Sequence, residues 1–347
     1  MSDQGLTYSA AGVDIDAAQN SLQSVGDAIT ATHNENVLGG IGSFGCLYDG
    51  SLAEYDRPIL VSSIDGVGTK TKIAQMTGDY SGIGHDIVNH CINDILCQGA
   101  KPLFFLDYFG CSKLDAAEFE AVVRGAADAC KSAGCALVGG ETAEMPGVYE
   151  FGEIDVVGSI VGVVEGSKRL PGIGMKAGDR LIGLASNGLH TNGYSLARRV
   201  LFEHAQLSVS DPLPTDSSTT VGEALLKPHT CYFNAVYALL QANSSIKAVA
   251  HITGGGLYDN LPRVLPSDLQ AKIVQRSWEP LPIFRAIQEL GQVPEDDLYR
   301  TFNMGIGMVL VVDQDDADTI TEAINANGIA AAEIGKLHSG NREVTLV

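Results

Sequence analysis

Basic residues are scarce in this chain, and none occurs before Arg57. The 347 residues include 22 Lys and Arg against 42 Asp and Glu, which gives a formal net charge of −20. This balance repels phosphate backbones and anionic lipid surfaces, so we expect no nucleic-acid and no membrane partner. An anionic substrate is compatible with it where a divalent cation screens the charge locally.

The sequence also lacks the patterns of secreted, zinc-binding and membrane-spanning proteins. Its seven cysteines include no C-x-x-C pair, and several lie in apolar runs, so we expect reduced, buried thiols and a cytoplasmic protein. The first ten residues have neither a basic nor an apolar segment, which argues against a signal peptide. No apolar run is long enough to span a bilayer.

The chain length predicts two domains, because domains usually hold roughly 100–200 residues. The segment 168–174, rich in Pro and Gly, is typical of a linker, so we place an N-terminal domain at 1–168 and a C-terminal domain at 175–347. Predicted strands and helices alternate on both sides of it, which indicates an α/β or α+β fold. The expected helices are 15–32, 80–98, 115–133, 193–205, 230–242, one after Gly256, 281–290 and 315–327. The expected strands are 57–64, 103–109, 135–139, 155–164, 180–185, 247–252, 271–275, 306–312 and 332–337, and 208–220 is expected to be a polar loop.

One strand ending carries a dense set of functional groups. The chain lacks the G-x-x-x-x-G-K-[ST] loop of common NTPases, yet the strand 57–64 runs directly into Asp65, Gly66, Gly68, Thr69 and Lys70. A carboxylate can bind a metal ion, glycines allow close backbone approach, and an ammonium balances a phosphate. The segment therefore indicates ATP chemistry on a different scaffold.

A glycine-rich loop precedes that strand. Residues 40–45 match G-x-G-x-x-G literally and include Gly40, Gly42 and Ser43. The dinucleotide motif needs a strand before it and a helix after it, and this segment has neither. Two interpretations stay open: a flap that covers phosphates, and a flexible loop without a ligand.

Three polar residues share one face of the predicted helix 80–98. Asp86, His90 and Asp94 follow one another at intervals of four. For Asp86 and His90 we expect a solvated polar face opposite the apolar stripe. Asp94 lies near the helix C-terminus, where the helix dipole disfavours a carboxylate, and this points to a compensating cation.

Further polar groups follow other predicted strands. Glu141 comes after two glycines at the end of the strand 135–139, where a carboxylate is well placed for Mg²⁺, and Glu144 is either a second ligand or a rim charge. His190 lies between glycines in a loop that could hold a phosphate, and it is either an acid–base group or structural. The turn 253–257 has the pattern of a phosphate-binding turn, and 301–308 that of a bulged strand in close packing.

Together these segments resemble one family, the phosphoribosylformylglycinamidine cyclo-ligases, also called aminoimidazole ribonucleotide (AIR) synthetases. The similarity covers essentially the whole chain, and its most specific strings are 141–147 and 300–305. The matching segments are Tyr8–Asp16, Asp65–Lys70, Asn93–Asp94, Gln98–Ala100, Pro102–Tyr108, Val138–Gly147, His190–Ser195, Thr253–Leu257 and Tyr299–Gly305.

The resemblance implies a homodimer in which the N-terminal sheets of two subunits pair into a barrel. It also implies closure of formylglycinamidine ribonucleotide (FGAM) to AIR at the cost of ATP, with Mg²⁺. Metal binding falls to Asp65, Asp94 and Glu141, nucleotide binding to Gly40, Gly42, Ser43, Asp65, Gly66, Gly68, Thr69, Lys70, Asp94 and Glu141. Substrate binding falls to His190, Thr191, Asn192, Gly254 and Gly255, and catalysis to His190, Lys70 and Asp94.

Two departures and several rival interpretations accompany this resemblance. The segment 27–34 carries no Lys or Arg, although the family usually has basic residues there, and His85 stands where an aliphatic residue is common. Related ATP-dependent enzymes of the same superfamily, among them selenophosphate synthetase, thiamine-phosphate kinase and the hydrogenase-maturation dehydratase, are the nearest alternatives. Cys46 lies just after the glycine loop, not at the position of the selenophosphate enzymes' reactive residue. A non-catalytic dimeric nucleotide-binding regulator is the alternative from another class.

Overall fold

The computed structural model describes residues 15–40, 42–172, 174–242 and 244–347. The family-like segment Tyr8–Asp16 and the N-terminal stretch judged for a signal peptide lie almost wholly outside these residues. The chain forms two compact units, and each is described by itself. Unit 1 comprises Met1–Ala53, Ser62–Cys91 and Pro102–Val161; unit 2 comprises Glu54–Val61, Ile92–Lys101 and Gly162–Val347.

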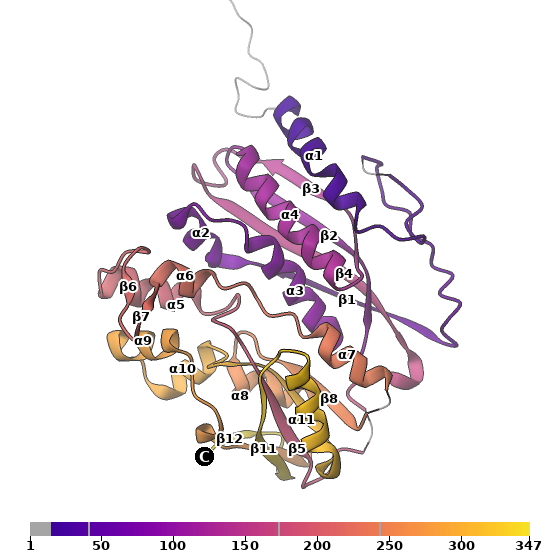
Figure 1. Ribbon diagram of the computed structural model, residues 1–347, viewed down its shortest axis with the longest axis vertical. Coiled ribbons are helices and arrows are strands. Elements are labelled where there is room, and N and C mark those ends of the chain that lie inside the picture. Colours follow the sequence, from indigo (N-terminus) through magenta and orange to yellow (C-terminus); the bar gives the residue numbers. More distant parts are fainter. Residues whose placement is uncertain (1–14, 41, 173, 243) are drawn as a thin grey trace, which may run out of the picture. The chain divides into compact units, whose positions relative to one another are not determined.

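The N-terminal half of the chain builds a four-stranded sheet with helices packed against it (Figure 1). The strand order is β1 (Pro58–Gly66), β4 (Ile154–Glu165), β2 (Lys101–Cys111) and β3 (Ala136–Glu144). β2 and β3 run parallel. The helices are α1 (Ile15–Thr30), α2 (Thr71–Thr77), α3 (Ile83–Leu96) and α4 (Ala116–Ser132), and α1 contacts both α4 and β3.

The sequence explains the ends of α4 and its contact with α3. Asp115 caps the helix, because its side chain accepts hydrogen bonds from the amides of Ala117 and Glu118. Gly134, with φ of +67°, follows the helix end, as the sequence predicted. Gly84 lets α3 approach closely, since a Cβ there would lie 2.0 Å from the carbonyl oxygen of Val122.

The predicted solvated face of the third helix is wrong. α3 is buried on nearly all sides: the exposed fraction is 0% for Asp86 and 4% for His90. The helical pattern alone could not show this, because the polar partners of the two side chains, Lys70 and Asp65, lie in another segment of unit 1. Their burial turns an expected surface into part of a candidate site.

Unit 2 contains a six-stranded mixed sheet. Its order is β12 (Val344–Leu346), β9 (Leu269–Ile273), β11 (Ala331–Ser339), β5 (Arg180–Ala185), β10 (Ile306–Val312) and β8 (Ile246–His251). All neighbours are antiparallel except the pair of β12 and β9. Every residue of β10 is buried, so this strand forms the centre of the core. A second, two-stranded sheet pairs β6 (Pro212–Leu213) with β7 (Asp216–Thr220).

Helices surround the sheet of unit 2, and α11 packs against β11 and β5. They are α5 (Tyr194–Arg198), which continues as a π-helix (Arg199–His204), α6 (Val221–Leu226), α7 (Phe233–Gln241), α8 (Gly256–Asn260), α9 (Pro282–Gly291), α10 (Glu295–Thr301) and α11 (Ala317–Ala326). The mixed sheets and the packed helices confirm the predicted α/β or α+β class.

Several local predictions differ from the structure. The expected polar loop 208–220 contains the β6–β7 hairpin, and α2, α6, α10 and β12 were not predicted. For α6 a signal existed: Thr220 and Glu223 form a capping box at its start. Cys46 is exposed, against the expectation of buried thiols, although all seven cysteines are free. Among the described residues, no helix is both long and apolar enough to cross a bilayer.

Candidate functional site

Unit 1 encloses a cavity of about 510 Å³, a size typical of small-molecule sites. The predicted nucleotide-binding residues Gly40, Gly42, Ser43 and Glu141 all line it. The glycine loop forms one wall, and β2 and β3 contribute another. The structure therefore brings together two parts of the predicted site that lie about a hundred residues apart in the sequence.

A carboxyl group that the sequence interpretation did not select also lines this cavity. Asp107 lies on β2, and burial raises the pKa of its carboxyl group to about 7. Its side chain packs on the backbone of β3, because a Cβ on Gly140 would lie 2.2 Å from Asp107 Oδ1. The sequence feature that could have identified Asp107 is an acidic residue inside the otherwise apolar strand 103–109.

The strand that carries Glu141 continues further than predicted. β3 does not end at residue 139 but runs through Glu144, so Glu141 lies within the strand, paired with Tyr108 of β2. Glu144 lines the same cavity, and its Oε1 accepts a hydrogen bond of 2.8 Å from the amide of Leu114. Together with Asp107, these oxygen donors fit the preference of Mg²⁺ for carboxylates.

The predicted phosphate-binding lysine is part of a buried ion pair. Lys70 Nζ lies 2.8 Å from Asp86 Oδ1, and both side chains have an exposed fraction of 0%. Burial lowers the pKa of Lys70, although the Asp86 carboxylate acts in the opposite direction. In this structure the charge of Lys70 is therefore balanced inside unit 1, and its contact with a phosphate stays a prediction.

Asp65, at the end of β1, remains partly accessible. Its Oδ1 is 3.5 Å from His90 Nε2, its Oδ2 accepts a hydrogen bond of 3.3 Å from Ser63, and its side chain is 30% exposed. Asp65 and Gly66 close β1, while Gly68, Thr69 and Lys70 form a 3₁₀ turn. Asp65 and Lys70 are not among the residues that line the cavity.

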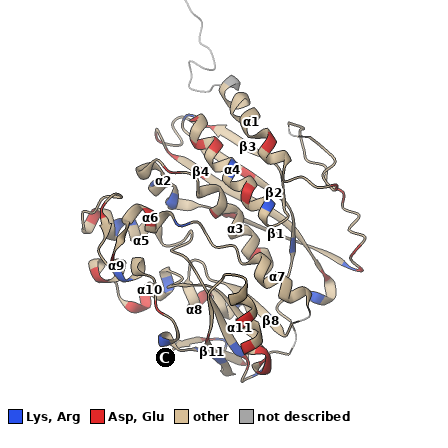
Figure 2. Ribbon diagram, viewed as in Figure 1, with Lys and Arg blue, Asp and Glu red and all other residues tan. Residues whose placement is uncertain are grey.

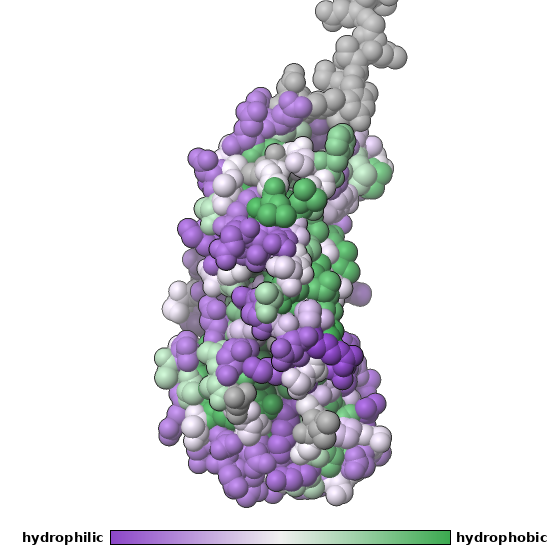
Figure 3. Space-filling view, turned by 90° about the vertical axis from the view of Figure 1, so that its right-hand side faces the viewer, coloured by the Kyte–Doolittle hydropathy of each residue, from purple (hydrophilic) through white to green (hydrophobic). Residues whose placement is uncertain are grey.

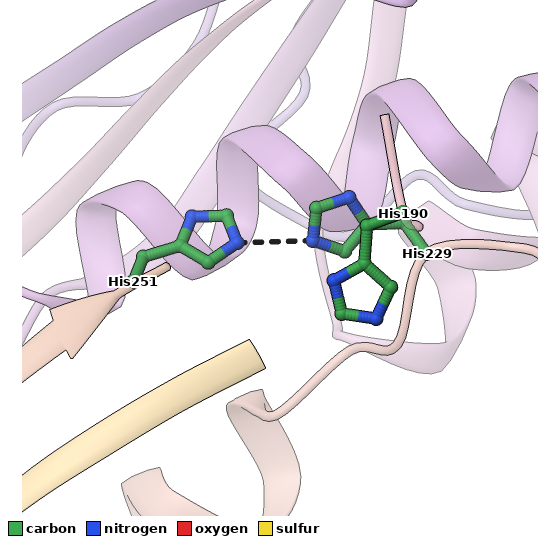
Figure 4. A group of neighbouring side chains, drawn as sticks. All are labelled: His190, His229 and His251. Carbon is green, nitrogen blue, oxygen red and sulfur yellow. Dashed lines mark hydrogen bonds between the residues drawn. The ribbon is translucent and has the colours of Figure 1, made fainter. Parts of the chain in front are cut away.

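Unit 2 contains a chain of buried histidines that begins at Asp94. Asp94 Oδ1 lies 2.8 Å from His251 Nδ1, and His251 Nε2 lies 2.9 Å from His229 Nε2 (Figure 4). His229 Nδ1 lies 3.4 Å from the hydroxyl of Thr191. Asp94 thus has an imidazole as its polar partner near the end of its helix, and the compensating cation that the helix dipole indicated stays a prediction.

The hydrogen bonds assign the tautomers of these rings. An ionised carboxylate only accepts, so His251 carries its proton on Nδ1 and accepts at Nε2. His229 must then donate from Nε2, which leaves its Nδ1 to accept from Thr191. With both rings neutral, the four groups form one directional chain of donors and acceptors.

His190 stacks on this chain. Its ring centroid lies 4.0 Å from that of His229, with 22° between the ring planes. The amide of Thr230 donates to His190 Nε2 at 3.4 Å, which places the proton of a neutral ring on Nδ1. His190 is only 1% exposed and has a φ of +62°, so unit 2 holds it in an uncommon backbone conformation.

Three histidine nitrogens within 4.8 Å of one another could bind a transition metal. A metal must lie near the plane of each ring, in line with the nitrogen lone pair. The near-parallel rings of His190 and His229 direct their lone pairs side by side and not toward one point. We therefore interpret the cluster as a hydrogen-bonded chain and not as a metal centre.

The predicted substrate residues gather around this chain in unit 2. Thr191 is buried beside His229, and Asn192 lies next to Gly254, since a Cβ there would be 3.6 Å from Asn192 Nδ2. Gly255, with φ of +95°, precedes α8. The sequence interpretation missed His229 and His251; the signal for His251 was its position at the end of an apolar strand, two residues before Thr253.

The predicted bulged strand is confirmed. The register of β10 shifts between Ile306 and Met308, at Gly307. A Cβ on Gly307 would lie 2.1 Å from the hydroxyl oxygen of Tyr232 and 2.6 Å from His190 Cε1. Glycine is required here because the bulge brings the backbone against the aromatic and imidazole rings.

Comparison with known families defines the class of this protein. Residues 50–164 match the family described as AIR synthase related protein, N-terminal domain, and residues 176–347 match its C-terminal domain. A solved structure titled hydrogenase maturation protein HypE in complex with ATP has the same fold, with a TM-score of 0.67 at 19% identity over 95% of this chain and 91% of that one.

Closer relatives define the family itself. A phosphoribosylformylglycinamidine cyclo-ligase of Alkaliphilus oremlandii is 45% identical over 98% of this chain and 99% of its own. One of Citrifermentans bemidjiense is 46% identical over the full length of both chains. The chain belongs to the phosphoribosylformylglycinamidine cyclo-ligase family.

Proposed function

We propose that this protein is a ligase of purine biosynthesis that closes FGAM to AIR and releases ADP and phosphate. The observation that carries the proposal is the identity of 45% and 46% to relatives of that name over essentially the whole chain. The glycine-lined cavity in unit 1 and the polar chain in unit 2 support it, because ring closure needs both a nucleotide site and a site that positions a polar substrate.

The chemistry follows from the poor leaving group of the substrate. The γ-phosphoryl group of ATP is transferred to the formamide oxygen, and ADP leaves. A nitrogen of the amidine then attacks the activated carbon, and the C–O bond breaks with loss of phosphate. The enzyme has to align the two reactants and neutralise the negative charge that spreads over the phosphoryl oxygens.

For the nucleotide we propose the N-terminal domain, residues 1–168. Gly40, Gly42 and Ser43 would cover the phosphates, and Asp65, Asp94 and Glu141 would supply oxygen ligands for Mg²⁺. The acceptor-only carboxylates suit this ion, which would neutralise phosphoryl charge when bound. Gly66, Gly68, Thr69 and Lys70 complete the proposed nucleotide site.

For the substrate we propose the C-terminal domain, residues 175–347, with His190, Thr191, Asn192, Gly254 and Gly255. Because His190 Nε2 accepts from the Thr230 amide, Nδ1–H of His190 is the group that would donate to a substrate oxygen or nitrogen. The chain from Asp94 to Thr191 would hold the neighbouring ring, His229, in one tautomer and orientation.

The proposal includes a homodimer in the cytoplasm. β1 is an edge strand, and it exposes Leu60 by 64% and Ile64 by 68% at alternate positions. Figure 3 shows hydrophobic residues at the surface of the upper half of that view. Apolar side chains on an edge strand favour pairing with another sheet, and a second copy of this chain would cover them.

The proposal is tested by mixing the purified protein with FGAM, ATP and Mg²⁺. We expect AIR and ADP in equal amounts, and loss of both when Mg²⁺ is chelated. ADP without AIR would move the substrate to a related enzyme of the superfamily. Neither product from a folded protein would overturn the proposal in favour of a nucleotide-binding regulator.

A further inference from the structure

Three positive side chains stand in one row across the sheet of unit 2. Lys336 of β11 is the direct cross-strand partner of Lys272 on β9 and of Arg180 on β5. Directly opposite residues place their Cβ atoms about 4.5–5.5 Å apart on the same face of a sheet. The row therefore brings three like charges onto three adjacent strands.

Such a row is unfavourable without a counter-charge. Like charges directly opposite one another destabilise a sheet. Lys and Arg number only 22 in a chain with 42 acidic residues, and Figure 2 shows how sparsely they are distributed. Within the part of the chain that the structure describes, Arg180 is the one member of the row in an ion pair, with its Nη1 3.3 Å from Glu333 Oε1. One carboxylate leaves an excess of positive charge.

A cavity of about 460 Å³ lies over this row, and all three cations line it. Its walls also include His338, the hydroxyl-bearing Ser277 and the half-exposed Val274. Burial, Lys272 and Lys336 all lower the pKa of His338, so its ring is neutral near pH 7 and can donate a single hydrogen bond. Glu333 also lines the cavity, which thus combines three cations and neutral donors with one carboxylate in a volume suited to a small molecule.

We propose that this cavity binds a small polyphosphate-bearing molecule, whose phosphates lie along Lys272, Lys336 and Arg180. Neighbouring strands are about 4.8 Å apart, so the row spans roughly 10 Å and matches a chain of phosphates better than a single one. Here the positive side chains would neutralise the phosphate charge directly, whereas a site made of carboxylates needs a metal ion to do so. All residues that line this cavity belong to unit 2.

The site is tested by calorimetric titration of the full chain with inorganic tripolyphosphate, at low salt and with EDTA present. We expect saturable binding of one molecule per chain that weakens steeply as salt is added. Lys336→Gln and Lys272→Gln should each weaken it at least tenfold, while Lys131→Gln, at an exposed position on α4, should leave it unchanged. Equal binding by wild type and the two row variants, or no binding by wild type, would overturn the proposal.

Two further measurements sharpen the result. Without ligand, Lys336→Gln should melt at a higher temperature than wild type, since it relieves repulsion, and tripolyphosphate should raise the melting temperature of wild type only. The same titration with ATP, still in EDTA, identifies the source of the phosphates. Tighter binding of ATP than of tripolyphosphate assigns the site to a nucleotide, and equal binding assigns it to the polyphosphate itself.

Discussion

The two units each bury a polar cluster, but they balance it in different ways. In unit 1, Lys70 and Asp86 form an ion pair whose side chains are wholly buried. In unit 2, the chain from Asp94 through His251 and His229 joins a carboxylate that is 31% exposed to two buried imidazole rings. The first cluster holds two opposite charges inside the protein; the second consists mainly of hydrogen-bonded rings.

Because of this difference, we expect mutations in the two clusters to affect different properties, folding stability in unit 1 and catalysis in unit 2. A buried ion pair contributes little net stability when intact, but removal of one partner leaves a charge that the interior cannot solvate. A neutral chain tolerates replacement better, while its tautomers depend on every member. We therefore expect the cluster of unit 1 to control folding of its unit, and the cluster of unit 2 to control turnover.

The largest effect should follow from breaking the ion pair. Asp86→Ala leaves the ammonium of Lys70 buried without its carboxylate, and we expect a loss of about 3–5 kcal/mol in the free energy of unfolding. Guanidinium unfolding followed by fluorescence measures it. Asp128→Ala, at an exposed position on α4, should cost less than about 0.5 kcal/mol.

A double variant sharpens this result. Lys70→Met combined with Asp86→Leu replaces both charges by apolar groups of similar size, and we expect it to recover most of the stability lost in Asp86→Ala. If the nucleotide proposal for Lys70 is right, the recovered protein should still lack ATP turnover. A single variant as stable as the Asp128→Ala control would refute the buried-charge argument.

The next largest effect should come from the charged end of the histidine chain. Asp94→Asn keeps an oxygen that can accept from His251 but removes the negative charge, so unit 2 should stay folded while kcat falls by at least about 10²-fold. The steady-state rate of AIR formation measures it, with Asp318→Asn on α11 as the matched control. Unchanged kinetics would remove Asp94 from the site.

A smaller effect is expected in the middle of the chain. His229→Leu removes the donor to His251 Nε2 inside a buried cluster, which should cost about 1–3 kcal/mol of stability. His229→Gln retains an amide donor and should lose less. Thermal unfolding compares the two with His204→Leu, at an exposed histidine in the same unit. If Leu and Gln have the same effect, the hydrogen bond to His251 does not stabilise the chain.

Regular elements with strong periodicity could be predicted from the sequence, and polar partners across the fold could not. The helix 115–133 was predicted within a residue of α4, because its cap, apolar face and terminal glycine agree. The pairing of Lys70 with Asp86 was missed, since a polar residue at regular helical spacing has the same pattern whether water or a distant ammonium faces it. Local pattern contains no information about such a partner.

The candidate site divides in the same way. Glu141 and His190 were selected because nearby glycines mark close backbone approach, although Glu141 lies within β3 and not at its end. His229 lies outside any such pattern, and only tertiary structure places it between His251 and Thr191. Asp107 was missed because its strand was interpreted from its apolar residues, although burying a carboxyl group in such a strand costs free energy unless it is hydrogen-bonded.

Asp107 gives the smallest and most specific prediction, and it extends the comparison to the cavity of unit 1. Burial raises the pKa of its carboxyl group to about 7 from an ordinary 3.8. The folded protein therefore holds a proton there that the unfolded chain releases between these values, so Asp107 contributes stability at low pH that is lost as the pH rises toward 7.

A cation in the cavity requires the ionised form of Asp107, so Mg²⁺–ATP affinity should rise roughly tenfold from pH 6 to pH 8. Fluorescence titration measures it, and Asp107→Asn, which retains any titration of the nucleotide itself, should flatten the profile. The same slope in both proteins would show that Asp107 does not face the bound ion.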